Sequence, residues 1–88
     1  MDNKELYQKL QADKYIGRDG ILNIEVKEHF YAIGHCYGIT IRSTNYSLTE
    51  LFLAKEINLV KDGVVEQIMH NVYSRYKKSK DKLEEENK

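Results

Sequence analysis

Residues 65–76, VEQIMHNVYSRY, decide the fold, because their apolar side chains recur with the period of an α-helix. The positions between them are polar, as expected for the outer face of a helix that packs on a core. The spacing therefore predicts a long amphipathic helix. Its core face carries Val65, Ile68, Met69, Val72, Tyr73 and Tyr76.

The segment before this helix carries the period of a β-strand instead. Residues 22–27, LNIEVK, alternate strictly between apolar and polar side chains, which is typical of a half-buried strand. Residues 30–42 keep the same period of two. They form either one long bent strand or two strands joined by a turn at Gly34–Gly38, and we favour two because an isolated hairpin is marginally stable in water. The sheet is predicted to be antiparallel.

Two capping signatures predict further helices. Asp2, with Glu5 three residues later, predicts a first helix at about 3–13 that ends before Gly17 and Gly20. Ser47, with Glu50 three residues later and an apolar run after it, predicts a second helix that continues to Val60.

A turn separates this second helix from the long one. Lys61, Asp62 and Gly63 interrupt the apolar pattern, and Asp62 can cap the helix that follows. The Asp-Gly pair is also a hairpin signal, which leaves a strand pairing as the alternative. We favour the turn between helices, since the helical period of residues 65–76 follows directly.

These elements together predict an α+β fold. It has a short N-terminal helix, an antiparallel sheet of two or three strands, and two C-terminal helices, the last one long and amphipathic. Residues 1–76 are expected to form a single domain. Residues 77–88 are almost wholly charged and form either a helical extension or a disordered tail.

Composition limits the classes of function. The 88 residues hold 14 basic and 14 acidic side chains, so the chain lacks the overall positive field of a generic nucleic-acid binder. A single cysteine excludes an internal disulfide and is typical of a reducing cytosol. No apolar run reaches the roughly 18 residues of a spanning helix. We expect a soluble cytoplasmic protein without membrane contact; its lysine-rich, proline-free composition resembles small accessory proteins of bacteria and phages.

No constellation of residues predicts catalysis. Cys36 and His35 are adjacent, and neighbours on an extended chain point to opposite faces, so this histidine does not activate this thiol. The remaining metal-binding candidates, His29 and His70, fall at no metal-ligand spacing with these two. The glycines of residues 17–20 match no phosphate-binding motif. We expect no enzyme activity, no cofactor and no metal.

A binding role is the leading hypothesis. Seven of the nine aromatic residues are tyrosine, which is favoured at interfaces, and Leu83 is an isolated apolar residue in the charged segment that core packing does not explain. The sequence predicts a small binding or regulatory protein that contacts a protein partner, including a second copy in a homodimer. The predicted interface residues are Tyr31, Tyr37, Tyr46, Tyr73, Tyr76 and Leu83.

Nucleic-acid binding is the alternative hypothesis. A basic run follows two tyrosines in the last helix, and such a run can contact phosphates. Three glutamates directly after it would repel the same phosphates. The predicted contact residues are Arg75, Lys77, Lys78, Lys80 and Lys82.

Overall fold

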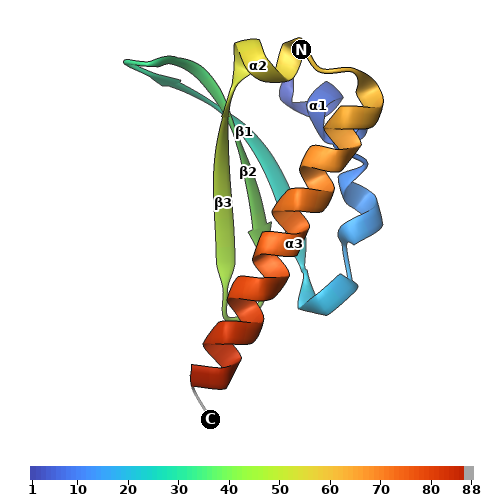
Figure 1. Ribbon diagram of the computed structural model, residues 1–88, viewed down its shortest axis with the longest axis vertical. Helices are drawn as coiled ribbons and strands as arrows, with labels where there is room; N and C mark the ends of the chain where they lie inside the picture. Colours follow the sequence, from blue (N-terminus) through green and yellow to red (C-terminus); the bar gives the residue numbers. More distant parts are fainter. Residues whose placement is uncertain (87–88) are drawn as a thin grey trace.

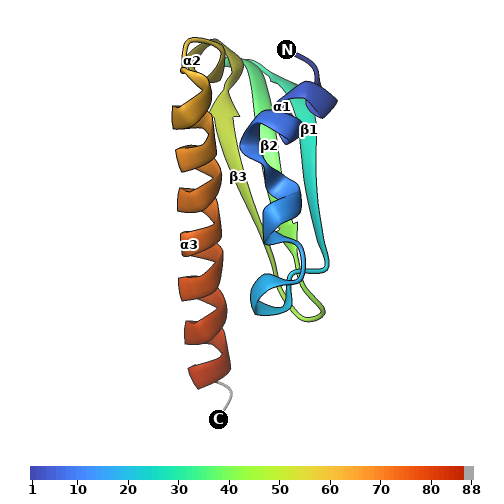
Figure 2. The ribbon, with the colours of Figure 1, turned by 90° about the vertical axis from the view of Figure 1, so that its right-hand side faces the viewer.

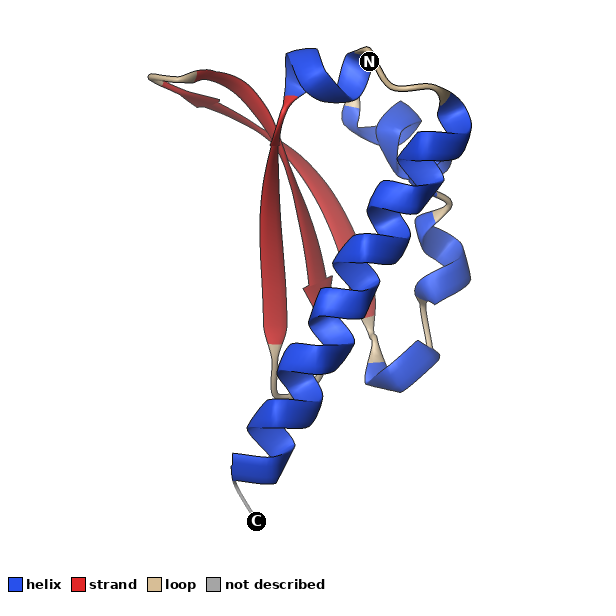
Figure 3. Ribbon diagram, viewed as in Figure 1, coloured by secondary structure: helices blue, strands red, loops and turns tan. Residues whose placement is uncertain are grey.

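The computed structural model describes residues 1–86 and has the predicted α+β architecture (Figures 1 and 3). Helices lie on one side of a three-stranded antiparallel sheet with the strand order β1-β2-β3. Two short 3₁₀ helices, Ala12–Tyr15 and Arg18–Gly20, connect the first helix to the sheet. The remaining elements are α1 (Asn3–Leu10), β1 (Asn23–Tyr31), β2 (Gly34–Arg42), β3 (Ser47–Leu53), α2 (Ala54–Asn58) and α3 (Asp62–Glu86).

The β1–β2 hairpin turns at residues 32–33, where neither predicted arrangement of residues 30–42 has a turn. Tyr31 pairs with Gly34, so Ala32 and Ile33 form a two-residue turn. Gly34 has a φ of 127°, a conformation that favours glycine, and it directly follows this turn. Both predicted arrangements, a single strand and a turn at Gly34–Gly38, are therefore wrong, although a sheet of three strands is confirmed.

The third strand comes from the segment predicted to begin a helix. Residues 47–53 pair with β2, from Arg42 opposite Ser47 to Cys36 opposite Leu53. The backbone ladder and the packing of Leu48 and Phe52 against the core outweigh a helix cap worth about 1 kcal/mol. The helix begins at Ala54 instead of Ser47, and it is followed by α3, so the prediction of two C-terminal helices is confirmed.

The first helix begins as predicted and ends early. The Asp2 carboxylate accepts a hydrogen bond from the backbone N–H of Glu5 at 2.7 Å, which satisfies one free amide of the first turn. The helix ends at Leu10 rather than at residue 13, because Gln11 takes the left-handed conformation with a φ of 54°. Gly17 and Gly20 lie beyond the helix, in the 3₁₀ connection.

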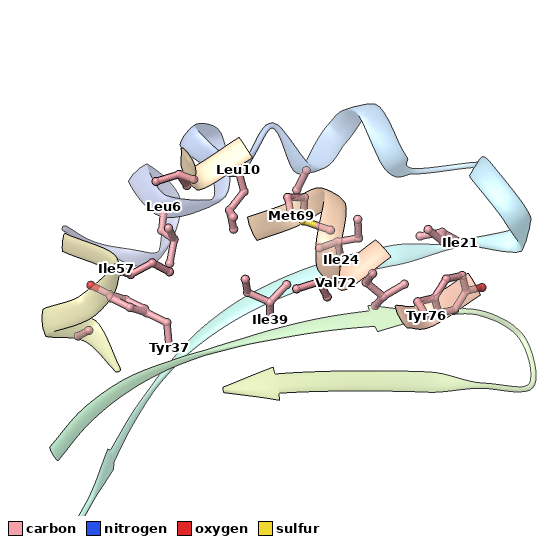
Figure 4. Close-up of a cluster of buried hydrophobic side chains, with 14 residues drawn as sticks. Leu6, Leu10, Ile21, Ile24, Tyr37, Ile39, Ile57, Met69, Val72 and Tyr76 are labelled. Atoms are coloured by element: carbon pink, nitrogen blue, oxygen red, sulfur yellow. The ribbon is translucent and has the colours of Figure 1, made fainter. Parts of the chain in front are cut away.

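The core lies between the sheet and the helices α1 and α3 (Figure 4). The predicted face of α3 is confirmed, since Val65, Met69, Val72 and Tyr76 are buried and Ile68 packs beside them. Each large buried apolar side chain stabilises the fold by about 1.5–3 kcal/mol relative to exposure. The other core residues are Leu6, Leu10, Ala12, Ile21, Ile24, Tyr37, Ile39, Ile41, Ala54 and Ile57.

The charged segment after Tyr76 continues the long helix. α3 reaches Glu86, so residues 77–86 are helical, and the last two residues of the predicted tail lie outside the described residues. Lys80 Nζ donates a hydrogen bond to the backbone carbonyl of Asp19 at 2.6 Å, which joins this part of the helix to the 3₁₀ connection. No helix of the described chain is long and apolar enough to cross a bilayer.

Candidate functional site

The sheet has one covered face and one bare face. The chain measures 42 × 29 × 17 Å, and the sheet and the single layer of helices are stacked along the intermediate dimension, so that α1 and α3 lie in front of the sheet in Figure 2. On β2, the side chains of Tyr37, Ile39 and Ile41 point into the core. The alternate positions, Cys36 and Gly38, therefore lie on the other face of the sheet. The core cluster of the described residues includes neither Cys36 nor Leu51.

The half of the bare face nearest the hairpin turn is mostly apolar, although Lys27 lies opposite Gly38 at its border with the other half. An added Cβ at Gly38 would lie 3.1 Å from His29 Nε2 and 3.3 Å from Leu51 Cδ2, so these two side chains close over the glycine. Cys36 is buried, with His29 and Leu53 as its cross-strand partners. The rings of His29 and Tyr31 stack at 5.5 Å. We call the face formed by His29, Tyr31, Cys36, Gly38, Leu51 and Leu53 the apolar half.

The other half of this face is polar. Thr40 and Thr49 share a hydrogen bond of 2.9 Å across β2 and β3. Arg42 donates to Glu25 at 3.2 Å, and Lys27 lies 3.9 Å from the same carboxylate oxygen. The polar half therefore carries charges of both signs that are partly neutralised by one another.

The end of the β1–β2 hairpin extends beyond the helices (Figure 1). β3 pairs with β2 only as far as Cys36, so residues 34 and 35 have β1 as their only strand partner. Phe30 and Ile33 are each 78 % exposed at this end. We call Phe30, Ala32, Ile33 and His35 the hairpin tip.

Contacts within the hairpin hold the tip in one conformation. The rings of Phe30 and His35 stack at 4.7 Å with an interplanar angle of 10°. His35 Nε2 lies 2.9 Å from Glu28 Oε2, and the His35 ring also contacts Tyr37 at 5.0 Å. Burial of Tyr37 raises the pKa of its phenol, and the negative charge of Glu28 adds to this effect.

The predicted interface residues lie in different parts of the chain. Tyr37 and Tyr76 are fully buried core residues and not surface anchors, because the helices cover them. Tyr46 packs against the core, and the Tyr73 hydroxyl donates to the Asp19 carboxylate, a hydrogen bond that raises the pKa of that phenol. Of the six predicted interface residues, Tyr31 alone lies on the bare face, at 48 % exposure.

Leu83 faces a pocket at the opposite end of the molecule from the hairpin tip. This pocket has a volume of about 410 Å³ between the β2–β3 turn and the C-terminal half of α3. Leu83 is 36 % exposed there, and Lys80, which lines the same pocket, is held by the Asp19 carbonyl. The residues lining the pocket are Gly20, Ser43, Thr44, Asn45, Tyr46, Lys80, Leu83 and Glu84.

Some basic side chains of the run in α3 form hydrogen bonds within the fold, and the others are exposed to solvent. Arg75 donates two hydrogen bonds to Glu50, and Lys80 donates to Asp19. In the part of the chain that the structure describes, no hydrogen bond or ion pair involves Lys77, Lys78 or Lys82. Three of the five predicted phosphate contacts thus remain exposed to solvent, on a helix whose next turn carries Glu84, Glu85 and Glu86.

The residues considered for catalysis do not converge. His35 and Cys36 point to opposite faces of β2, and the Cys36 thiol instead approaches the carbonyl of Gly34 at 3.7 Å. Within residues 1–86, no three His, Cys, Asp or Glu side chains come together in an arrangement that could hold a metal ion.

The sequence analysis missed three exposed apolar residues of the hairpin tip and the bare face. Phe30, Ile33 and Leu51 were assigned to no site, because the turn at Ala32–Ile33 lacks the usual turn residues and residues 47–53 carry a helix-capping signature. Comparison of the chain with protein-family models, with curated proteins and with solved structures finds no match.

Proposed function

We propose that this chain is a small non-enzymatic binding protein that contacts another protein through its hairpin tip. The observation that carries the proposal is the pair of large apolar side chains, Phe30 and Ile33, that project from the fold with most of their surface in water. Monomeric proteins seldom expose adjacent large apolar side chains without a binding role, and aromatic anchors contribute much of the free energy at interfaces.

The tip is also ordered before it binds. Phe30 stacks on His35, and the ladder from β1 to β2 runs to Tyr31 and Gly34. Immobilising a mobile side chain at an interface costs about 0.5–1.5 kcal/mol of conformational free energy, and an anchor that already has one conformation avoids most of this cost. The matching partner surface is an apolar pocket that accepts one aromatic and one branched aliphatic side chain.

A protein fits the tip better than a membrane surface does. The ionisable side chains beside Phe30 are His35 and Glu28, and the carboxylate of Glu28 is repelled by anionic headgroups. The proposal also places the protein in the cytoplasm, because Cys36 is a free buried thiol of the kind that reducing compartments maintain.

Photo-crosslinking in the native host tests the proposal. The photoreactive analogue p-benzoylphenylalanine replaces Phe30 or Ile33, and Leu22, an exposed residue just before the other end of β1, serves as the control position. We expect adducts that contain a second polypeptide from positions 30 and 33 and none from position 22. Adducts to lipid, equal adducts from position 22, or no adduct from positions 30 and 33 would contradict the proposal.

A further inference from the structure

We infer that the outer edge of β3 binds an extended segment of another protein, which adds to the sheet as a fourth strand. The strand order β1-β2-β3 gives β3 a partner on one side only. The backbone groups on the other side of an edge strand are a template for a further strand, and hydrogen bonds to them provide affinity. This edge is distinct from the hairpin tip, which β3 does not reach, so the inference does not depend on the proposed function.

The register of β3 against β2 shows which backbone groups face outward. The Ser43 N–H donates to the Tyr46 carbonyl at 2.7 Å, so these two residues form a hydrogen-bonded pair of the antiparallel ladder. Such pairs recur at every second residue, and the register continues without a bulge to the end of β3. The N–H and C=O groups of Thr49 and Leu51 therefore point away from β2. The residues of β3 that bond to β2 are Leu48, Glu50 and Phe52.

β3 lacks the features that usually keep an edge strand from pairing. Charged side chains, prolines and bulges block such edges in many proteins. β1, the other edge strand, carries Glu25, Lys27 and Glu28, whereas β3 has Glu50 as its one acidic or basic residue. Glu50 lies beneath α3, where Arg75 Nη1 is 2.8 Å from its Oε2, so the charge of Glu50 is compensated within the fold. The edge of β3 therefore suits an uncharged extended segment.

The pocket at Leu83 lies at the end of the same strand. Residues 43–46, which line it, lead directly into β3, and α3 contributes Lys80, Leu83 and Glu84. The Tyr46 and Leu83 side chains make part of its wall apolar, and its volume of about 410 Å³ leaves room for a large apolar side chain. One extended segment can thus pair with β3 and place a side chain in this pocket. Backbone pairing then provides affinity, and the pocket provides specificity.

A single strand fits this edge better than a second copy of the chain does. In Figure 2, α3 lies in front of the sheet at its β3 edge, away from β1, and Arg75 of α3 binds Glu50 of β3. A second copy that paired through its own β3 would bring its own α3 to the same place, so the two helices would compete for the space in front of the new pair of strands. An extended segment carries no such helix. We expect it to be rich in β-branched and other apolar residues, which favour the extended conformation.

Selection from a phage-displayed library of random decapeptides, followed by fluorescence anisotropy of the enriched peptide, tests the inference. Thr49→Pro removes an outward N–H without breaking a bond to β2, and proline is tolerated at such positions of edge strands. Thr49→Val is the matched control, because it loses the same hydroxyl and keeps the N–H. We expect the peptide to bind Thr49→Pro at least about tenfold more weakly than Thr49→Val. No enriched peptide, or equal binding to the two variants, would overturn the inference.

Amide hydrogen exchange of the wild type provides a second test, which holds even if Thr49→Pro does not fold. In the free chain we expect fast exchange at Thr49 and Leu51 and slow exchange at Glu50, and the enriched peptide should slow exchange at the first two. Protection confined to the hairpin tip would overturn the inference and leave the proposed function standing. Protection of Thr49 that rises with the concentration of the chain alone would assign the edge to a second copy and would also overturn it. Failure of tip crosslinking together with peptide-dependent protection at Thr49 would refute the proposed function and support this inference.

Discussion

Arg75 on α3 binds Glu50 on β3 through one guanidinium nitrogen, Nη1, which lies 3.0 Å from Oε1 and 2.8 Å from Oε2. The Glu50 side chain is only 16 % exposed, because it lies on the covered face of the sheet beneath the long helix. A basic residue that the sequence assigned to phosphate binding therefore fixes the position of α3 over the sheet.

Removing this contact is expected to weaken the fold. Arg75→Ala leaves a mostly buried carboxylate without its partner, and we expect a loss of about 1 kcal/mol in the free energy of unfolding. Urea unfolding followed by circular dichroism measures it. Lys77→Ala, two positions further along the same helix, is the control and should change the free energy by less than about 0.5 kcal/mol. Equal effects of the two variants would show that the Arg75 contact contributes nothing.

Nucleic-acid binding is expected to be weak. Arg75 and Lys80 are engaged within the fold, and the glutamates at the end of α3 repel phosphates. In fluorescence anisotropy with labelled duplex DNA and single-stranded RNA at about 50 mM salt, we expect no saturation below about 100 μM protein. Micromolar, salt-sensitive binding that is lost when Lys77, Lys78 and Lys82 are changed to glutamate would establish the alternative function instead.

The reactivity of Cys36 reports on the packing of the bare face. The thiol is buried beside Leu51 and Leu53, so we expect slow alkylation of the wild type near neutral pH. Leu51→Ala opens the surface above the thiol and should speed labelling several-fold. Leu59→Ala provides the comparison and should label at the wild-type rate. Rapid labelling of the wild type itself would mean that the thiol is not covered as described.

Tyr7 should make stability depend on pH in the alkaline range. Burial raises the pKa of its phenol from 10.0 to about 12, with a further contribution from the hydrogen bond of 2.6 Å to Asp13. Because the folded state holds the proton more tightly, the stabilisation is complete below pH 10 and is lost as the pH rises towards 12. The difference between wild type and Tyr7→Phe in urea midpoint should therefore shrink over this range. A constant difference would rule out the linkage.

The elements with local signals were predictable from the sequence. The helix through residues 65–76 has an apolar period that alone defines its buried face, and the Asp2 cap is a local hydrogen bond. The strand at 22–27 was found for the same reason, although it extends to Tyr31.

The elements fixed by distant partners were not predictable in this way. Residues 47–53 carry leucine on both faces, and their strand conformation depends on pairing with residues 36–42 of β2. Glu50 looked like part of a helix cap, whereas its partner is Arg75, 25 positions further along the chain. The candidate surfaces were missed as a consequence. Leu51 was assigned to a helix, and Phe30 was assigned to the strand after the turn, whereas it belongs to β1 before the turn.

The central claim is that the helices cover one face of the sheet and leave the other face and the hairpin tip open for binding. Solvent paramagnetic relaxation of methyl and aromatic NMR signals at low protein concentration tests it directly. We predict strong relaxation at Phe30, Ile33 and Leu51 and almost none at Ile39 and Val72. Strong relaxation at Ile39 and Val72 together with protection of Phe30 and Leu51 would contradict the account.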